Sequence, residues 1–115
     1  MNGLTYLASP FSHPDPTVRE HRFHEACRIA GKLMKLEGKR VFSPIAHSFS
    51  VEQHFSDGQL EGMEFWLNQD FAVLRHCAEL LVLQLDGWER SKGIAAEVEF
   101  AAKCGIPVFY IEPTP

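Results

Sequence analysis

The sequence predicts a single α/β domain in which helices cover both faces of a doubly wound parallel sheet of about four strands. The first observation behind this prediction is that short, almost continuously apolar segments alternate with longer segments of helical periodicity. The second is the length of 115 residues, which matches one domain with one hydrophobic core. Residues 1–115 are therefore expected to fold as one unit.

The first strand and the first helix are predicted from clear boundary signals. Thr5–Ala8 is short and apolar, which predicts a buried strand, and Ser9-Pro10 predicts the loop that follows it. Asp15-Pro16 supplies a helix N-cap and a proline at the first helical position. The helix is expected to continue to Gly38. Its apolar residues recur at helical spacing at Phe23, Ala26, Ala30 and Leu33.

The second strand is predicted at Arg40–Ser43, directly before Pro44. Ile45–Leu60 has no clear period, and we interpret it as a long functional loop or lid. His47 and His54 lie in this segment without metal-ligand spacing to each other or to a cysteine. Neither a metal site nor another cofactor is therefore expected.

The second half of the chain predicts two further helices and two further strands. A helix from about Glu61 to His76 precedes the buried strand Glu79–Gln84. Asp86-Gly87 then turns the chain into a third helix, which ends at Gly105. Pro107–Ile111 is the fourth strand. The apolar face of the third helix is marked by Ile94, Val98 and Ala101.

This alternation predicts right-handed crossovers and a flavodoxin-like strand order. In such a sheet a ligand binds beyond the carboxyl ends of the strands, where the direction of winding reverses. That point lies beside the loops after the first and third strands, at Ser9 to Asp15 and Leu85 to Lys92. The topology alone thus predicts a binding site between these two loops.

Charge and composition limit the partners and the compartment. The chain has 11 Lys and Arg against 15 Asp and Glu, a net charge of −4, and no basic stripe, so polymeric nucleic acid is not expected. A small phosphorylated ligand is compatible, because one or two arginines and a few backbone N–H groups hold a phosphate. No segment matches a signal peptide or a membrane span. Cys27, Cys77 and Cys104 predict reduced thiols in core positions and a cytoplasmic protein.

One carboxylate of the second helix falls within an apolar stripe. Asp70 lies near the centre of this stripe on a helical wheel. Burial of an unpaired carboxylate is unfavourable, so Asp70 must be hydrogen-bonded, protonated or facing a cavity. The stripe consists of Met63, Trp66, Leu67 and Leu74.

The third helix holds a second inward carboxylate. Glu97 lies between Ile94 and Ala101, at the rim of the inward face and close to the winding switch. Glu99 points outward and can pair with Lys103, four residues further on. The two glutamates of this helix are therefore not equivalent.

Two interpretations of the inward carboxylates remain open at this point. In the structural interpretation, Asp70 ties down a loop through backbone N–H groups and Glu97 accepts a hydrogen bond from a buried Tyr or Ser. In the catalytic interpretation they act together, because two carboxylates are the minimum for nucleophilic and acid–base work on one bond.

Three motifs resemble the nucleoside 2-deoxyribosyltransferase superfamily. They are Tyr6–Pro10, Asn68-Gln69-Asp70 and Ser91-x-Gly93-x-x-x-Glu97, and their order and spacing cover most of the chain. The string Leu85–Ser91 is similar to that of a small uncharacterised branch of this superfamily. The resemblance implies cleavage or transfer at the N-glycosidic bond of a (deoxy)nucleoside or nucleoside 5′-monophosphate, through a covalent glutamyl-sugar intermediate.

The resemblance also implies roles for individual residues. Glu97 would be the nucleophile, Asp70 would contact the sugar or protonate the leaving base, and Tyr6 would orient the nucleophile. Ser91 would contact a 5′-phosphate, although an N-cap explains a serine there equally well. Gly93 would allow close approach of the backbone. The expected substrate-binding residues are Ser9, Pro10, Phe11, Arg19, Asp86, Ser91 and Gly93.

The chain departs from its relatives in two places. Val98 follows Glu97 where many relatives have glycine, and the sequence ends at Pro115, directly after the fourth strand. The second departure removes a segment with which some members of the superfamily complete a neighbour's site, so a homo-oligomer is expected and a shared active site is left open. The alternative function is a non-catalytic nucleotide-binding module on the same fold, and the sequence does not separate transferase from hydrolase.

Overall fold

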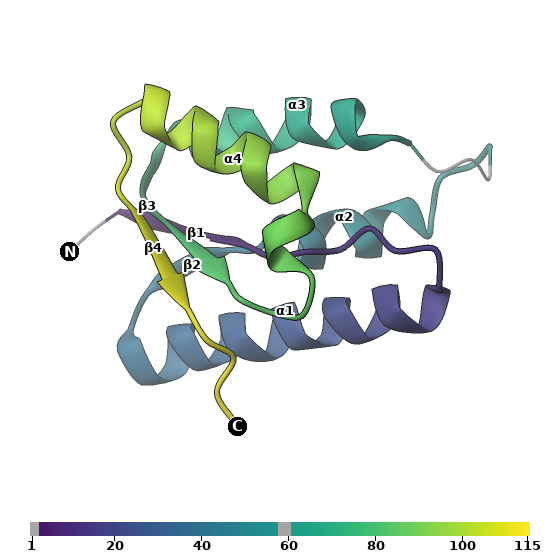
Figure 1. The fold of residues 1–115 in the computed structure, drawn as a ribbon, viewed down its shortest axis with the longest axis horizontal. Helices are drawn as coiled ribbons and strands as arrows, with labels where there is room; N and C mark the ends of the chain where they lie inside the picture. Colours follow the sequence, from purple (N-terminus) through teal and green to yellow (C-terminus); the bar gives the residue numbers. More distant parts are fainter. Residues whose placement is uncertain (1–2, 58–60) are drawn as a thin grey trace.

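The predicted fold class is confirmed. A computed structural model describes residues 3–57 and 61–115, and within them four parallel strands form one sheet in the order β2-β1-β3-β4 (Figure 1). This is the flavodoxin-like order, with β1 and β3 as the two central strands. The strands are β1 (Leu4–Ala8), β2 (Arg40–Phe42), β3 (Cys77–Leu83) and β4 (Val108–Ile111).

Helices cover both faces of the sheet. Helix α1 lies on one face, and α3 and α4 lie side by side on the other (Figure 1). Helix α2 follows β2 and contacts both α1 and β1. A short 3-10 helix, η1, lies between β3 and α4. The helices are α1 (Pro16–Glu37), α2 (Pro44–Glu52), α3 (Met63–Leu74), η1 (Trp88–Arg90) and α4 (Lys92–Lys103).

The central strands are apolar where both of their faces are buried, from Tyr6 to Ala8 and from Leu80 to Leu83. On β1, Tyr6 and Ala8 pack toward α3 and α4, whereas Leu7 packs toward α1. The same alternation continues on β3, where Val82 and Leu83 face opposite layers. A strand buried on both faces carries a continuous apolar run instead of an alternating one, which is the pattern that predicted these strands.

The boundaries of α1 follow the predicted capping signals. The Asp15 side chain accepts a hydrogen bond from the Thr17 backbone N–H at 2.9 Å, and Pro16 occupies the first helical position. The helix ends at Gly38, which adopts a left-handed conformation with φ of 66°. Elsewhere the boundaries differ by a few residues, and β3 begins at Cys77 instead of Glu79.

The prediction of a loop or lid from Ile45 to Leu60 was wrong over most of its described part. Helix α2 occupies Pro44–Glu52, and residues 58–60 lie outside the described part of the chain. The helix begins because the Ser43 side chain accepts a hydrogen bond from the Ala46 backbone N–H at 3.2 Å. The Phe49 ring then packs between those of Phe11 and Phe23, with centroid distances of 5.4 and 4.6 Å.

All three cysteines are free, but only one occupies the predicted core position. Cys77 is buried, Cys27 is half-buried and Cys104 is exposed after the end of α4. The expectation of three core thiols was therefore wrong for Cys104. No helix in residues 3–57 and 61–115 has both the length and the apolar character needed to cross a membrane.

Candidate active site

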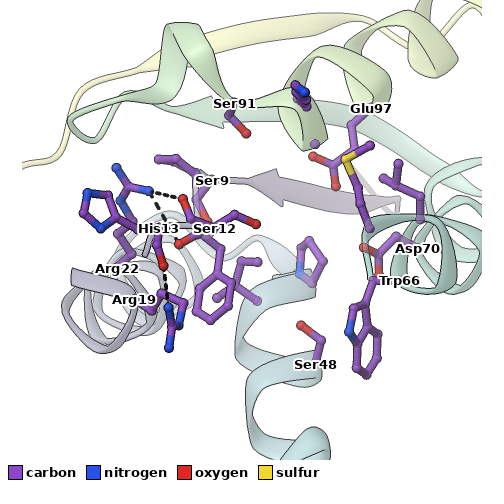
Figure 2. Close-up of a pocket in the computed structure, with 18 of the residues that line it drawn as sticks. Ser9, Ser12, His13, Arg19, Arg22, Ser48, Trp66, Asp70, Ser91 and Glu97 are labelled. Carbon is purple, nitrogen blue, oxygen red and sulfur yellow. Dashed lines mark hydrogen bonds between the residues drawn. The ribbon is translucent and has the colours of Figure 1, made fainter. Parts of the chain in front are cut away.

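A cleft of about 790 Å³ lies at the carboxyl end of the sheet, where the topology predicts a ligand. The loops after β1 and β3 border it, and α2 and α3 contribute to its other walls (Figure 2). Most of the expected site residues line it. These are Ser9, Pro10, Phe11, Arg19, Asp70, Ser91, Gly93 and Glu97.

Glu97 lies in the second turn of α4, with its carboxyl group buried between this helix and the sheet. Its exposed fraction is 5%, and it accepts a hydrogen bond at Oε2 from the hydroxyl of Tyr6. Tyr6 is fully buried on β1 and does not line the cleft. The central strand therefore holds Glu97 from behind, in agreement with both the structural and the catalytic interpretation of the bond.

Asp70 faces the cleft from α3, and Figure 2 shows it at the same end of the cleft as Glu97. Its exposed fraction is 6%. Among the described residues, no backbone N–H or side chain donates a hydrogen bond to its carboxylate. The structural interpretation, in which Asp70 ties down a loop, therefore has no hydrogen bond to support it here.

Burial shifts the acid–base properties of both carboxylates. It raises the pKa of Asp70 to about 7. The pKa of Glu97 rises to about 8, chiefly through burial, while the Tyr6 hydrogen bond lowers it and the charge of Asp70 raises it. The pKa of Tyr6 is also raised, first by burial and then by the nearby carboxylates, so Tyr6 stays a donor. The pair thus retains at least one proton near neutral pH.

Two serines lie at the strand ends. Ser9 follows β1, is 6% exposed, and its Oγ is a buried oxygen without a hydrogen-bond partner among the described residues. An unpartnered buried hydroxyl is unfavourable by about 1–3 kcal/mol, which a polar ligand atom would offset. Ser91 caps α4, because its Oγ accepts from the Ile94 N–H at 3.1 Å. Ser91 therefore does act as an N-cap, and it also lines the cleft.

The remaining expected residues take different positions. Phe11 lines the cleft and packs edge-on against Phe49. The Arg19 guanidinium donates to the carbonyl oxygen of His13. A Cβ added at Gly93 would meet only Ser91 Oγ at 3.8 Å, so the space beside this glycine is open. Asp86 is exposed and does not line the cleft.

The sequence reasoning missed several lining residues. Ser48 comes from α2, a helix that was not predicted because its sequence has no clear helical period. Met63 and Trp66 belong to the predicted core stripe, but Met63 is 50% exposed and both side chains line the cleft. Arg22 also lines the cleft; its place one turn after Arg19 made it a possible phosphate contact, but it was not among the expected site residues because an arginine on a helix is usually solvated. No cluster in the described residues gathers three or more metal-ligating side chains.

A family model described as "Domain of unknown function (DUF1937)" matches residues 3–113. No protein with curated annotation matches the chain. Both the cleft and the elements that build it lie within the matched residues.

Among solved structures, the chain is similar to a 2-deoxyribosyltransferase from the psychrotolerant bacterium Bacillus psychrosaccharolyticus. The two share 24% sequence identity, with a TM-score of 0.65. The similarity covers 96% of this chain and 72% of the other. At this level of identity the comparison establishes a common fold.

Proposed function

The chain belongs to the DUF1937 family, and we propose that it is an enzyme that cleaves or transfers at the N-glycosidic bond of a (deoxy)nucleoside or nucleoside 5′-monophosphate. The observation that carries this proposal is a pair of buried carboxylates, Glu97 and Asp70, at one end of one cleft. The fold shared with a 2-deoxyribosyltransferase supports it.

The proposed reaction begins with attack by the Glu97 carboxylate on C1′ of the sugar. A bond forms between the carboxylate oxygen and C1′ while the C1′–N bond breaks, and the leaving base takes the electron pair of that bond. Asp70 donates a proton to the base. An acceptor base or water then attacks C1′ and gives its proton to the Asp70 carboxylate, the bond to Glu97 breaks, and both carboxyl groups return to their initial states.

The reaction needs one negative charge for the nucleophile and one proton for the leaving base, and a pair that retains one proton carries both. Because the pKa of Glu97, about 8, lies above that of Asp70, about 7, this proton resides mainly on Glu97 in the ligand-free protein, and the proposed reaction requires it to move to Asp70 when the substrate binds. Tyr6 favours the charged form of Glu97 through its hydrogen bond and occupies Oε2. The second oxygen is then available to the sugar.

The other residues of the cleft suit the rest of such a substrate. The unpartnered hydroxyl of Ser9 and the α4 N-terminus near Ser91 provide polar contacts for a sugar hydroxyl or a 5′-phosphate. Trp66 and Phe11 provide aromatic surface for a base. We propose these contacts as the substrate-binding surface.

Product analysis tests the proposal. The protein is incubated with a panel of deoxynucleosides and their 5′-monophosphates, with and without a free acceptor base, and released or exchanged base is quantified by chromatography. The Glu97→Gln variant is run in parallel, with Glu99→Gln as the matched control because Glu99 is exposed on the same helix.

Turnover that is lost in Glu97→Gln and kept in Glu99→Gln supports the enzyme, and the need for an acceptor separates transferase from hydrolase. The absence of turnover across the panel, together with nucleotide-induced thermal stabilisation of the wild type, would favour the non-catalytic binding module instead.

A further inference from the structure

Arg22 connects the two loops that border the cleft. Its Nη1 donates to the carbonyl oxygen of Ser12 at 3.0 Å and lies 3.5 Å from that of Phe11, the bonds drawn in Figure 2. Its Nη2 donates to the carbonyl oxygen of Asp86 at 2.8 Å. Within the described residues, no hydrogen bond joins residues 9–15 directly to residues 84–91, so the two loops are linked by hydrogen bonds through Arg22.

The sheet itself does not hold these loops together. The pairing of β1 with β3 ends at Ala8 and Val82, close to the ends of the two strands. Beyond that point the chain after β1 leads to α1 on one face, and the chain after β3 leads to α4 on the other (Figure 1). The loops therefore diverge, and a connection between them has to come from a side chain.

Gly87 leaves room for this connection. It adopts a left-handed conformation with φ of 90°, and an added Cβ would lie 2.7 Å from Arg22 Nη2. The residue after Asp86 must therefore both turn the chain and let the guanidinium approach. The left-handed turn favours glycine by itself, and a larger residue would also displace the guanidinium from its position beside Asp86.

The geometry of the guanidinium, and not an ion pair, accounts for an arginine at this position. Its acceptors are neutral carbonyl oxygens on two sides, and no carboxylate lies in salt-bridge distance within the described residues. Burial and the neighbouring Arg90 lower its pKa, while Asp86 raises it. A planar fork reaches acceptors on both sides, whereas the single ammonium of a lysine does not.

We propose that Arg22 is a positioning residue that fixes the separation of the two loops, and thereby the width of the cleft between Ser9 and Ser91, before a ligand binds. The effect of Arg22 on the ordering of the two loops does not depend on a ligand. Its consequence for a substrate rests on the proposed function: Glu97 and Asp70 are held by α4 and α3, so loss of Arg22 should raise KM and leave kcat nearly unchanged.

Hydrogen exchange of the ligand-free protein tests the first part. Arg22→Lys keeps the charge and removes the fork, and Arg28→Lys is the control because Arg28 is exposed on the same helix and pairs with Glu25. Amide exchange over residues 84–91 should rise about tenfold in Arg22→Lys alone, since hydrogen bonds to a charged donor are lost. Unchanged exchange there, or an equal rise throughout β1 and β3, would overturn the proposal.

A double-mutant cycle with Gly87→Ala provides a second, independent test. The added methyl group strains the turn in every background, but it collides with the guanidinium only when Arg22 is present. Gly87→Ala should therefore raise exchange over residues 84–91 less in Arg22→Lys than in the wild type. Additive effects of the two substitutions would contradict the proposed contact.

Kinetics then separates this inference from the proposed function. With an active substrate from the panel, Arg22→Lys should raise KM about tenfold with kcat within about twofold. If the KM of Arg22→Lys equals that of the wild type, a positive charge at this position is sufficient for substrate binding, and the positioning role would fail. If the wild type turns over no substrate, the proposed function fails, while the exchange experiment still decides the role of Arg22.

Discussion

The carboxylates at the two ends of the central strands have opposite surroundings. At the amino end, Glu79 accepts hydrogen bonds from Thr5 Oγ1 at 2.6 Å and Lys39 Nζ at 2.8 Å, and these bonds lower its pKa. At the carboxyl end, burial raises the pKa values of Glu97 and Asp70. The first end satisfies its charge, and the second retains protons that a ligand can use. The difference separates a stabilising site from a reactive one.

The largest expected effect is a loss of kcat at the carboxyl end that has no counterpart at the amino end. Glu97→Gln should lower kcat by at least about 10³-fold on an active substrate and leave ligand affinity within a few-fold, because the nucleophile is lost. Glu79→Gln should leave kcat within about twofold and lower the free energy of unfolding by about 1 kcal/mol. Steady-state kinetics and urea denaturation of both variants measure this. Equal losses of kcat would remove the distinction between the two ends.

The pH dependence of stability should have opposite signs for the two ends. Folded Asp70 and Glu97 keep protons up to about pH 7 and 8, whereas their ordinary pKa values are 3.8 and 4.5. The folded state therefore binds more protons than the unfolded state in this window, and stability falls as pH rises through it. The pKa of Glu79 is lowered on folding, so its contribution is present above its ordinary value of 4.5 and is lost as pH falls.

Urea denaturation at pH 5, 6.5 and 8 measures these signs. The wild type should lose a few kcal/mol between pH 5 and pH 8, and the Asp70→Asn/Glu97→Gln double variant should lose little, because its amides do not titrate. Glu79→Gln, which leaves the cleft intact, should keep the wild-type loss. If the double variant still follows the wild-type curve, groups other than Asp70 and Glu97 cause the pH dependence of stability.

Tyr6→Phe should sharpen the comparison at the reactive end. The phenolic hydrogen bond lowers the pKa of Glu97, so its removal should raise that pKa and shift the acid limb of kcat/KM to higher pH. We expect about a tenfold loss of kcat at neutral pH, since the carboxylate is harder to ionise and less well oriented. The pH profile of kcat/KM measures this, and an unshifted acid limb would limit Tyr6 to packing.

The smallest effect is expected at the satisfied end. Lys39→Met removes a half-exposed donor to Glu79 and should cost about 1 kcal/mol or less, because the pair is partly solvated. Arg28→Met, which removes an exposed pair on α1, should cost less still. Denaturant midpoints for both variants at low and high salt provide the measurement. A change in kcat for Lys39→Met would mean that the two ends are coupled.

Local signals predicted most of the fold. Asp15 and Gly38 marked the ends of α1 because capping depends on a few neighbouring atoms. The central strands were evident because burial on both faces leaves an apolar run from Tyr6 to Ala8 and from Leu80 to Leu83. Helix α2 was missed although Ser43-Pro44 repeats the capping signal of Asp15-Pro16, since its packing depends on Phe11 and Phe23 from distant segments.

The candidate site was predictable where a residue contradicts its surroundings. Asp70 stood out because a carboxylate in an apolar stripe needs a reason, and the structure turns it toward the cleft. Arg22 did not stand out, because an arginine on a helix is usually solvated and its three carbonyl acceptors come from folding. Helical periodicity also gave no way to tell a side chain in the core, such as Leu74, from one that lines a cleft, such as Met63.

Tyr6 belongs to the hydrophobic core and, through its hydrogen bond to Glu97, also to the candidate active site. Tyr6 belongs to the same buried cluster as Leu80 and Val82, so the tight packing that stabilises the domain also aims the candidate nucleophile. Changes that repack this layer would be expected to tilt the phenol and alter the reaction rate without touching the cleft. Thermostability and activity are therefore not independent targets for engineering in this chain, and a screen of core variants should score both together.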